Sequence, residues 1–153
     1  MTERKIAIVT GSATGVGAAT ALRLARCGYD VLINYSKSEA EARQSEAACR
    51  AAGADTLLLR GDVAQDADCK ALAQGAMGRW GRIDALVNNA GISTFSGAAN
   101  WDALDAQTFQ RIIGVNAVGM FQMVRACAPH LKAVQGAIVN VSSVAGSLGI
   151  GSS

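Results

Sequence analysis

The sequence is poor in the residues that build metal sites and disulfide frameworks. His130 is its single histidine, and none of its four cysteines forms a Cys-x-x-Cys pair. Zinc ligands normally come as closely spaced cysteines and histidines, so no metal site is predicted. Reduced thiols, buried in the core of a cytoplasmic protein, are the favoured interpretation of the cysteines.

Charge and long apolar runs are also scarce. Charged residues make up 17% of the chain, its net charge is +2, and the basic residues are scattered. A nucleic-acid-binding protein would instead gather its basic residues in a patch or stripe. Residues 1–5 lead directly into a short apolar run, with neither a signal-peptide core nor a membrane-spanning segment. We therefore expect a cytoplasmic protein with no nucleic-acid and no membrane partner.

What the sequence does contain is a regular alternation of short β-branched runs and helical patterns. Strands are predicted at residues 5–10, 31–35, 56–59, 83–87 and 137–141, and helices at 16–27, 38–52, 66–80 and 105–131. Strands that alternate with helices indicate an α/β doubly wound parallel sheet in three layers. Right-handed crossovers on both faces predict the strand order 3-2-1-4-5. We expect one domain over residues 1–153, with a small, flexible segment from residue 144.

Two local patterns refine the predicted helices. Ser38 and Glu41 have the spacing of a capping box, which would start the second helix at this serine. The long helix carries one apolar stripe, formed by Met120, Met123, Val124 and Cys127, and a second, formed by Val115, Val118 and Phe121. A helix that is apolar on two sides is expected to be buried on two sides.

The most informative stretch is the glycine-rich turn at residues 10–17, between the first strand and the first helix. Gly11, Gly15 and Gly17 would permit a tight turn and let a phosphate approach the backbone amides. The helix that follows would present unpaired N–H groups to the same anion. A P-loop needs Lys and then Ser or Thr after its last glycine, and neither is present. The turn thus predicts a pyrophosphate cradle, although close packing of helix on strand is an alternative.

Polar residues and glycines also follow the other four predicted strands. They are Tyr35-Ser36-Lys37, Asp62-Val63, Asn88-Asn89-Ala90-Gly91 and Ser142-Ser143. Ligands of open α/β sheets bind outside the carboxyl ends of the strands. Because all five strand ends carry such residues, one composite ligand site is favoured over a turn that serves packing alone.

Together these motifs resemble the short-chain dehydrogenase/reductase family, of the single-domain type that includes 3-oxoacyl carrier-protein reductases. The matching segments are residues 10–17, 62–63, 88–91, Val115-Asn116-Ala117 and 138–143, in the order that the family has them. The resemblance implies a Rossmann-type fold and reversible hydride transfer between NAD(P)(H) and a small alcohol or carbonyl substrate. It also implies a homo-oligomer, a dimer or tetramer, paired through the long helix.

The resemblance also implies roles for individual residues. Gly11, Ser12, Val16 and Gly17 would hold the pyrophosphate, with Thr14 and Gly15 completing the turn, while Asp62 and Val63 contact adenine and Asn89, Ala90 and Gly91 line the ribose and nicotinamide. Ser143 matches the catalytic serine, whose hydroxyl would donate to the substrate oxygen where negative charge develops. Asn116 would hold a water of the proton relay. A turn serine and a polar helix-interior residue are the structural alternatives for these two.

Coenzyme preference depends on the end of the second strand. An acidic residue there would bind the ribose 2′-hydroxyl and repel a 2′-phosphate. This sequence has Tyr35 instead, followed by Ser36 and Lys37, and a hydroxyl with a cation could receive a phosphate. We therefore expect NADP(H) to be preferred, with NAD(H) possible, although Lys37 could equally be an ordinary solvated lysine.

One family motif has no counterpart in the sequence. The general acid of the family is a tyrosine with a lysine four residues later, whereas the tyrosines here are Tyr29 and Tyr35. The motif is expected shortly beyond Ser153, where a further strand would also cover the apolar edge formed by the fifth strand. Residues 1–153 are thus expected to be the N-terminal part of a longer reductase. A noncatalytic dinucleotide-binding module is the alternative.

Overall fold

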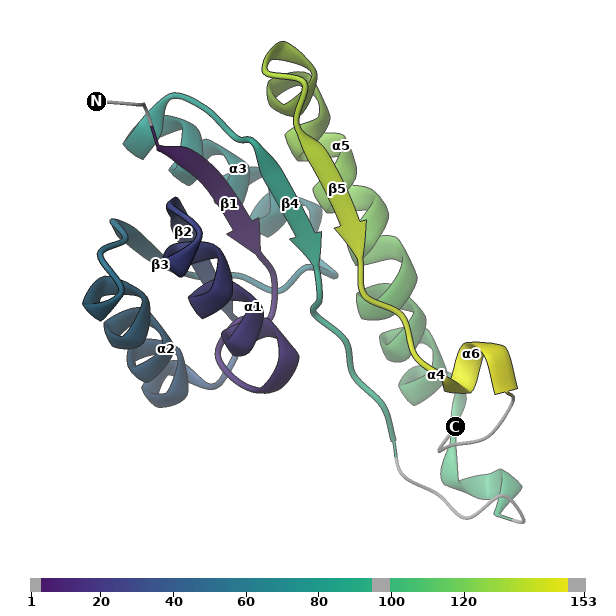
Figure 1. Ribbon diagram of the computed structural model, residues 1–153. Coiled ribbons are helices and arrows are strands. Elements are labelled where there is room, and N and C mark those ends of the chain that lie inside the picture. The colour runs from purple at the N-terminus through teal and green to yellow at the C-terminus, as the bar shows by residue number, and fades with distance from the viewer. Residues whose placement is uncertain (1–3, 95–99, 149–153) are drawn as a thin grey trace.

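The computed structural model describes residues 4–94 and 100–148. Their fold is built around a five-stranded parallel sheet (Figure 1). Its strands are β1 (Lys5–Val9), β2 (Tyr29–Tyr35), β3 (Thr56–Arg60), β4 (Ala85–Asn88) and β5 (Ala137–Asn140). Their spatial order is β3-β2-β1-β4-β5, and each neighbouring pair is parallel. The predicted fold class and strand order are confirmed.

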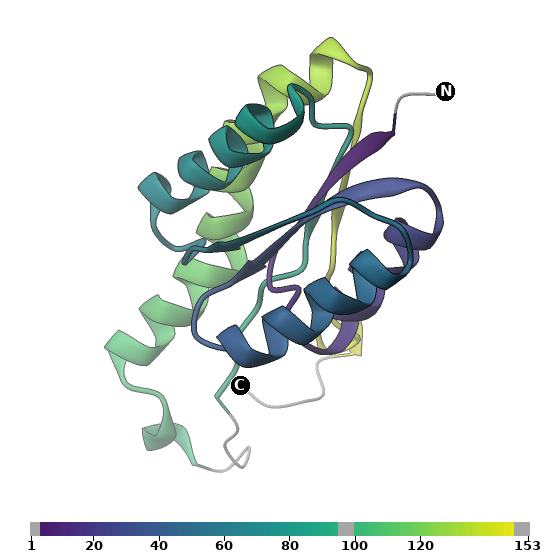
Figure 2. The ribbon, with the colours of Figure 1, turned by 90° about the vertical axis from the view of Figure 1, so that its left-hand side faces the viewer.

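Helices cover both faces of the sheet and make the three layers. They are α1 (Gly15–Arg26), α2 (Glu39–Ala51), α3 (Asp66–Trp80), α4 (Ala106–Ile113), α5 (Gly119–Ala133) and α6 (Ala145–Leu148), with a 3-10 turn, η1 (Trp101–Ala103), and a π-helix, η2 (Gly114–Val118). The views in Figures 1 and 2 show α1 and α2 on one face and α3 and α5 on the other. The long helix predicted at 105–131 is thus α4 and α5 joined through η2.

The sheet separates two hydrophobic cores. On the α3–α5 side, Ile8 pairs in register with Leu32 and Leu86, and all three are fully buried. On the α1–α2 side, Val9 stands beside Ile33 in the same way. Neighbouring residues of one strand therefore face opposite cores, which is why the buried strands read as continuous apolar runs.

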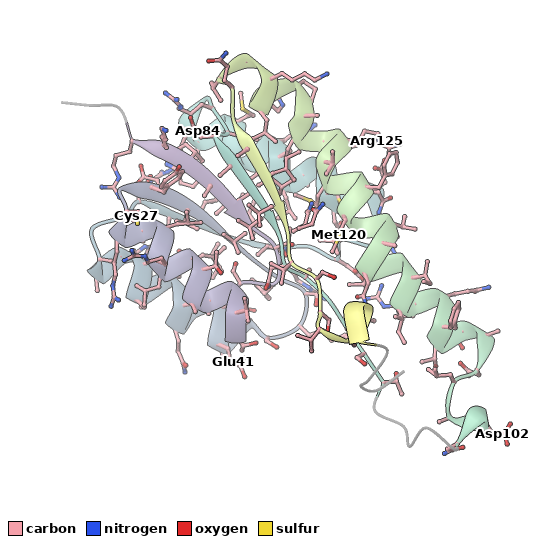
Figure 3. The ribbon with its side chains drawn as sticks, turned by 45° about the vertical axis from the view of Figure 1, so that its right-hand side comes forward. Cys27, Glu41, Asp84, Asp102, Met120 and Arg125 are labelled. Carbon is pink, nitrogen blue, oxygen red and sulfur yellow. The ribbon has the colours of Figure 1, made fainter. Side chains whose placement is uncertain are left out.

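The amino end of the sheet is closed by a buried carboxylate, Asp84. Its side chain accepts a hydrogen bond of 2.8 Å from the Ile6 amide and pairs with the Arg82 guanidinium at 2.6 Å. Burial alone would raise the pKa of Asp84, but the bonds from Arg82 and Ile6 outweigh it and hold the pKa below its usual value. Figure 3 shows Asp84 at the end of the sheet where the strands begin.

Two further acids at this end also have protein partners. Asp30 pairs with Arg4 at 2.6 Å and accepts from the Asp55 amide at 2.8 Å. The Asp55 carboxylate in turn accepts from Arg79 at 2.8 Å and from the Trp80 indole at 2.8 Å. The bond from Arg79 is the main reason that the pKa of Asp55 is lowered.

The capping-box prediction for the second helix is wrong. Ser38 precedes α2 as expected, but its side chain makes no capping hydrogen bond, and its backbone, at φ −86° and ψ 66°, lies outside the extended region that this motif requires. The segment from residue 144, expected to be small and flexible, contains the short helix α6 at Ala145–Leu148, and residues 149–153 lie outside the described part of the chain. The Ala145 amide donates to the Ser143 hydroxyl at 3.2 Å, which starts this short helix.

The long helical segment buries its first apolar stripe and only part of the second. Met123 and Cys127 are fully buried against α3 and the sheet, and Val115 of the second stripe is buried, whereas Val118 and Phe121 are exposed. Among the described residues, Ala106–Ala133 is long and apolar enough to cross a membrane by length and composition, a test that a core helix also passes. The packing of α5 on α3 and β4 accounts for the buried residues. The expected burial on two sides is therefore only partly correct.

Candidate functional site

A cavity of about 300 Å³ lies at the carboxyl end of the sheet. Its lining comes from the segments after β1, β2, β3 and β4, together with residues of α4 and η2. Of the predicted coenzyme-binding residues, the lining includes Gly11, Thr14, Val16, Gly17, Tyr35, Ser36, Lys37, Asp62, Val63, Asn89, Ala90 and Gly91. Four strand ends that are distant in sequence thus meet around one space.

At two positions of the glycine turn, residues 10–17, the structure leaves no space for a side chain. A Cβ on Gly11 would lie 2.8 Å from the Ala90 Cα, and one on Gly17 would lie 2.4 Å from both the Asn89 Nδ2 and the Gly11 carbonyl oxygen. Gly11 also has φ +61°, in the left-handed region that favours glycine. These contacts bring the turn against the loop after β4, so both segments share one cavity wall.

The turn leaves backbone donors without protein acceptors. The first bond of α1 runs from the Ala18 amide to the Thr14 carbonyl, at 3.1 Å, and the Thr14 side chain provides no cap. In the described part of the chain, the amides of Gly15, Val16 and Gly17 donate no hydrogen bond to a protein acceptor. Because α1 also has no acidic residue in its first turn, its N-terminus suits an anion such as a pyrophosphate.

Ser12 has a different place from its neighbours in the turn. Its hydroxyl donates to the Val9 carbonyl at 2.7 Å and accepts from the Asn34 amide at 3.0 Å, and its side chain is fully buried. The Asn34 side chain continues this network, since its oxygen accepts from the Gly11 amide at 3.1 Å and its nitrogen donates to the Gly61 carbonyl at 3.0 Å. These two side chains shape the turn from inside the protein.

The loop after β4 is held by the buried hydroxyl of Thr10, the residue that follows β1. Thr10 Oγ1 accepts from the amides of Asn89 and Ala90, each at 3.0 Å, while the Asn89 side chain donates to the carbonyls of Thr10 and Gly11. The loop is therefore fixed against the glycine turn by bonds in both directions. Such bonding holds Asn89, Ala90 and Gly91 along the cavity before any ligand arrives.

Beyond β3, the cavity wall is tied to the long helix. Arg111 of α4 pairs with Asp62 at 2.7 Å, and both line the cavity. A Cβ on Gly119 would lie 2.7 Å from the Val63 side chain, so α5 packs closely on the next residue. Arg111 was not among the predicted site residues. It belongs to a helix, and nothing in the sequence around it indicates that its side chain reaches the end of β3.

A carboxylate near the end of β2, that of Glu39, is held in an ion pair. Glu39 opens α2 and accepts from Arg43 at 2.6 Å, which is the main reason that the pKa of this carboxyl is lowered. The Tyr35 hydroxyl contributes to the same shift. Glu39 is therefore a carboxylate that Arg43 already neutralises, and the strand end itself carries Tyr35, Ser36 and Lys37.

Comparison with known proteins agrees with this arrangement. Residues 5–152 match the family described as short chain dehydrogenase. The chain belongs to the short-chain dehydrogenase family. The strand order of its sheet and the position of its glycine turn, between β1 and α1, agree with this family match.

Individual relatives are longer than this chain. A protein assigned as ketoacyl reductase 2 of the granaticin polyketide synthase, from Streptomyces violaceoruber, is 40% identical over 152 residues, which cover 99% of this chain and 59% of that protein. The 3-oxoacyl-[acyl-carrier-protein] reductase FabG of Staphylococcus aureus is 34% identical over 146 residues, 95% of this chain and 58% of that protein. The chain thus spans about three-fifths of the length of these curated relatives.

A solved structure shows the same fold. A short-chain dehydrogenase/reductase crystal structure from Burkholderia xenovorans superposes with a TM-score of 0.94 at 42% sequence identity. The superposition covers 99% of this chain and 64% of that chain. The Rossmann-type architecture is therefore shared with a member of the family at close sequence distance.

Neither of the two residues with expected catalytic roles is in the lining of the main cavity, although Asn116 contacts Ile92, which is. Asn116 is in the π-helix η2, where its side chain accepts from the Ile92 amide at 2.9 Å and donates to the Ile92 carbonyl at 2.8 Å. Both ends of this amide are thus engaged with Ile92, in the segment after β4. Ser143 follows β5, is exposed, and has its hydroxyl oxygen engaged by the Ala145 amide.

Proposed function

We propose that this chain binds NADP(H) in the cavity at the carboxyl end of the sheet, as part of an oxidoreductase that acts on an alcohol or carbonyl substrate. The single observation that carries the proposal is the row of unpartnered amides at Gly15, Val16 and Gly17, at the start of α1. When bound, the nicotinamide coenzyme would supply or accept the hydride.

The coenzyme would be held by the cavity walls described above. The amides of α1 would bind the pyrophosphate, with Gly11 and Gly17 keeping side chains out of its way. Asp62 and Val63 would contact adenine, and the loop 89–91 would line the ribose and nicotinamide end. The bonds from Thr10 to this loop support that role, because they position it without using ligand.

A preference for NADP(H) is supported by the end of β2. Tyr35, Ser36 and Lys37 line the cavity where an acid would otherwise bind the ribose 2′-hydroxyl. The carboxylate of Glu39, one turn further on, is paired with Arg43. A 2′-phosphate would therefore meet hydroxyl groups and a lysine, while NAD(H) would lack a carboxylate partner.

The chemistry itself would involve residues beyond the coenzyme cavity. We propose that Ser143 donates a hydrogen bond to the substrate oxygen and that Asn116 helps to hold a water of the proton relay. Residues 1–153 would form the coenzyme-binding part of a single-domain reductase whose tyrosine and lysine lie outside them. The names of the relatives make a 3-oxoacyl thioester the first substrate to test.

We also propose that the protein is a homo-oligomer, a dimer or a tetramer, that pairs through α4 and α5. Phe109, Ile113, Val118 and Phe121 are exposed along this segment. Figure 3 shows Arg125 on the outer side of α5, and its guanidinium lies 5.4 Å from the centre of the Phe121 ring. An exposed apolar row of this length is typical of an interaction surface. The four free thiols support the expected cytoplasmic location.

The test is a titration of the intact protein with NADPH and NADH, followed by a reduction assay on a carbonyl panel that includes a 3-oxoacyl thioester. We expect saturable binding, tighter for NADPH, and coenzyme oxidation with at least one carbonyl. Ser143→Ala should lower kcat roughly 100-fold while leaving the coenzyme Kd unchanged. Ser142→Ala, which removes the adjacent hydroxyl, is the matched control.

Two outcomes would overturn parts of this proposal. Binding of both coenzymes with no reduction of any carbonyl would favour a noncatalytic dinucleotide-binding module. No saturable binding of either coenzyme would refute the assignment of the cavity.

A further inference from the structure

Arg60, the last residue of β3, lies beside the end of β2 in the sheet. Its Cα is the register partner of Tyr35, so the two residues stand next to each other across the ladder. Register partners in parallel strands project to the same face. The exposed side chain of Arg60 is thus placed beside the segment Tyr35-Ser36-Lys37, although 25 residues separate it from Tyr35.

The guanidinium is held at one nitrogen and available at the others. Arg60 Nε donates to the Ser36 carbonyl at 3.2 Å, which orients the planar group along the turn after β2. Within residues 4–94 and 100–148, neither of its terminal nitrogens has a hydrogen-bond or ion-pair partner. An arginine that is fixed through Nε and keeps its outer edge open can bind an anion with two parallel bonds.

This open edge faces a second hollow of about 380 Å³, next to the main cavity. Its lining is Ser36, Lys37, Arg60, Gly61, Asp62 and Asp68, of which Ser36, Lys37, Gly61 and Asp62 also line the main cavity. The hollow therefore continues the main cavity past the end of β2. Arg60 and Lys37 are its two cationic groups.

The acids around this hollow are already engaged. Asp62 pairs with Arg111, and the Asp68 carboxylate accepts from the Asp62 amide at 2.8 Å. In contrast, neither Lys37 nor Arg60 has an ion-pair partner within 4.0 Å in the described part of the chain. Among the same residues the Asp68 carboxylate has no cationic partner, and the charge of Arg60 also contributes to the lowered pKa of Glu39. Lys37 and Arg60 still leave the hollow with a net positive charge, which suits a phosphate monoester with its roughly two negative charges.

We propose that Arg60 is a specificity-determining residue, which binds the 2′-phosphate of NADP(H) together with Lys37. This inference rests on the proposed assignment of the main cavity to a dinucleotide. It adds a residue from the neighbouring strand to the segment 35–37. Arg60 would contribute twice, by holding the Ser36 carbonyl and by pairing with the phosphate.

The experiment compares Arg60→Gln with the unaltered intact protein, by measuring Kd for NADPH and for NADH. Glutamine removes the charge and keeps a group that can donate to the Ser36 carbonyl. We expect NADPH binding to weaken about 10-fold to 30-fold, the loss typical of a charge-assisted bond, and NADH binding to stay within about twofold. Arg60→Lys should recover part of the NADPH affinity. Arg26→Gln, at the exposed end of α1, is the control for loss of one positive charge.

The outcomes separate this inference from the proposed function. Equal weakening of both coenzymes would show that Arg60 only supports the turn, and unchanged affinity for both would exclude it from the site. Either result, with NADPH still preferred by the unaltered protein, overturns the role of Arg60 alone. If the unaltered protein prefers NADH, the NADP(H) assignment and the inference both fail. Adenosine 2′,5′-bisphosphate, set against 5′-AMP, repeats the comparison without the nicotinamide end.

Discussion

The two ends of the sheet treat polar groups in opposite ways. At the amino end, Asp30, Asp55 and Asp84 each accept hydrogen bonds from an arginine and a backbone amide or indole. At the carboxyl end, within residues 4–94 and 100–148, the first amides of α1 have no acceptor, and Lys37 and Arg60 have no ion-pair partner. A polar group that is satisfied within the protein stabilises the fold, whereas one left unsatisfied at a cavity is available to a ligand. We therefore expect the amino end to contribute mainly to folding and the carboxyl end to bind the ligand.

The strongest test of this comparison is Asp84→Ala. The substitution removes the ion pair with Arg82 and leaves the buried Ile6 amide without its side-chain acceptor, so we expect a loss of about 3 kcal/mol in the free energy of unfolding. Urea denaturation of the intact protein gives this quantity. Coenzyme affinity of the folded fraction should not change, and a weakened coenzyme Kd would show that the two ends are not independent.

Gly17→Ala tests the opposite end. The added Cβ would lie 2.4 Å from a backbone carbonyl oxygen, so the turn must shift, and we expect coenzyme binding to weaken roughly 100-fold. Titration with NADPH measures the loss. Gly78→Ala in α3 is the control, because a Cβ there meets nothing within 4 Å and should leave binding intact. Unchanged affinity in Gly17→Ala would place the ligand elsewhere.

Thr10→Val sharpens the comparison, because this buried hydroxyl at the carboxyl end serves the protein itself. Valine has nearly the same shape but cannot accept from the amides of Asn89 and Ala90. We expect a loss of about 1–2 kcal/mol in unfolding free energy together with a severalfold weaker coenzyme Kd. Thermal denaturation and coenzyme titration of the same sample measure both. A change in stability without a change in Kd would mean that the loop 89–91 does not contact the coenzyme.

The smallest effect is expected from Asp55→Asn. Arg79 lowers the pKa of Asp55, so the ionised carboxylate stabilises the folded state above the unfolded pKa of about 3.9, and that contribution is lost as pH falls through the lower folded pKa. The pair is partly exposed, so the contribution should stay below about 1 kcal/mol. Unfolding midpoints between pH 2 and pH 6 should therefore fall less steeply with acid in the variant. An identical slope would mean that Asp55 carries no such linkage.

Much of the fold could be predicted because its signals are local. Each strand is a short apolar run and each helix has a periodic pattern, so their order along the chain predicts the doubly wound sheet. The helix predicted at about residues 66–80 is α3, Asp66–Trp80. The cap of α2 was not predicted correctly, since the Ser38 spacing was right but its backbone angles depend on how the chain leaves β2.

The candidate site was predictable where its residues follow strands directly. Most of the turn at 10–17 and the segments after β2, β3 and β4 line the cavity, but the predicted residues Ser12 and Gly15 do not. Arg60, Asn34 and Arg111 were missed, because each reaches the site through packing between segments. Only the polarity of Asn34, at the end of a buried apolar strand, offered a signal that could have revealed it.

The sequence by itself determined the order of the elements, the glycine turn and the family to which this chain belongs. The tertiary structure alone decided which groups are paired and which are left open. Asp62 is paired because α4 brings Arg111 to it across the fold, and Arg60 stands beside Tyr35 because β3 pairs with β2 in register. Such pairings join residues that are distant along the chain, so they depend on how the layers pack and not on any local pattern.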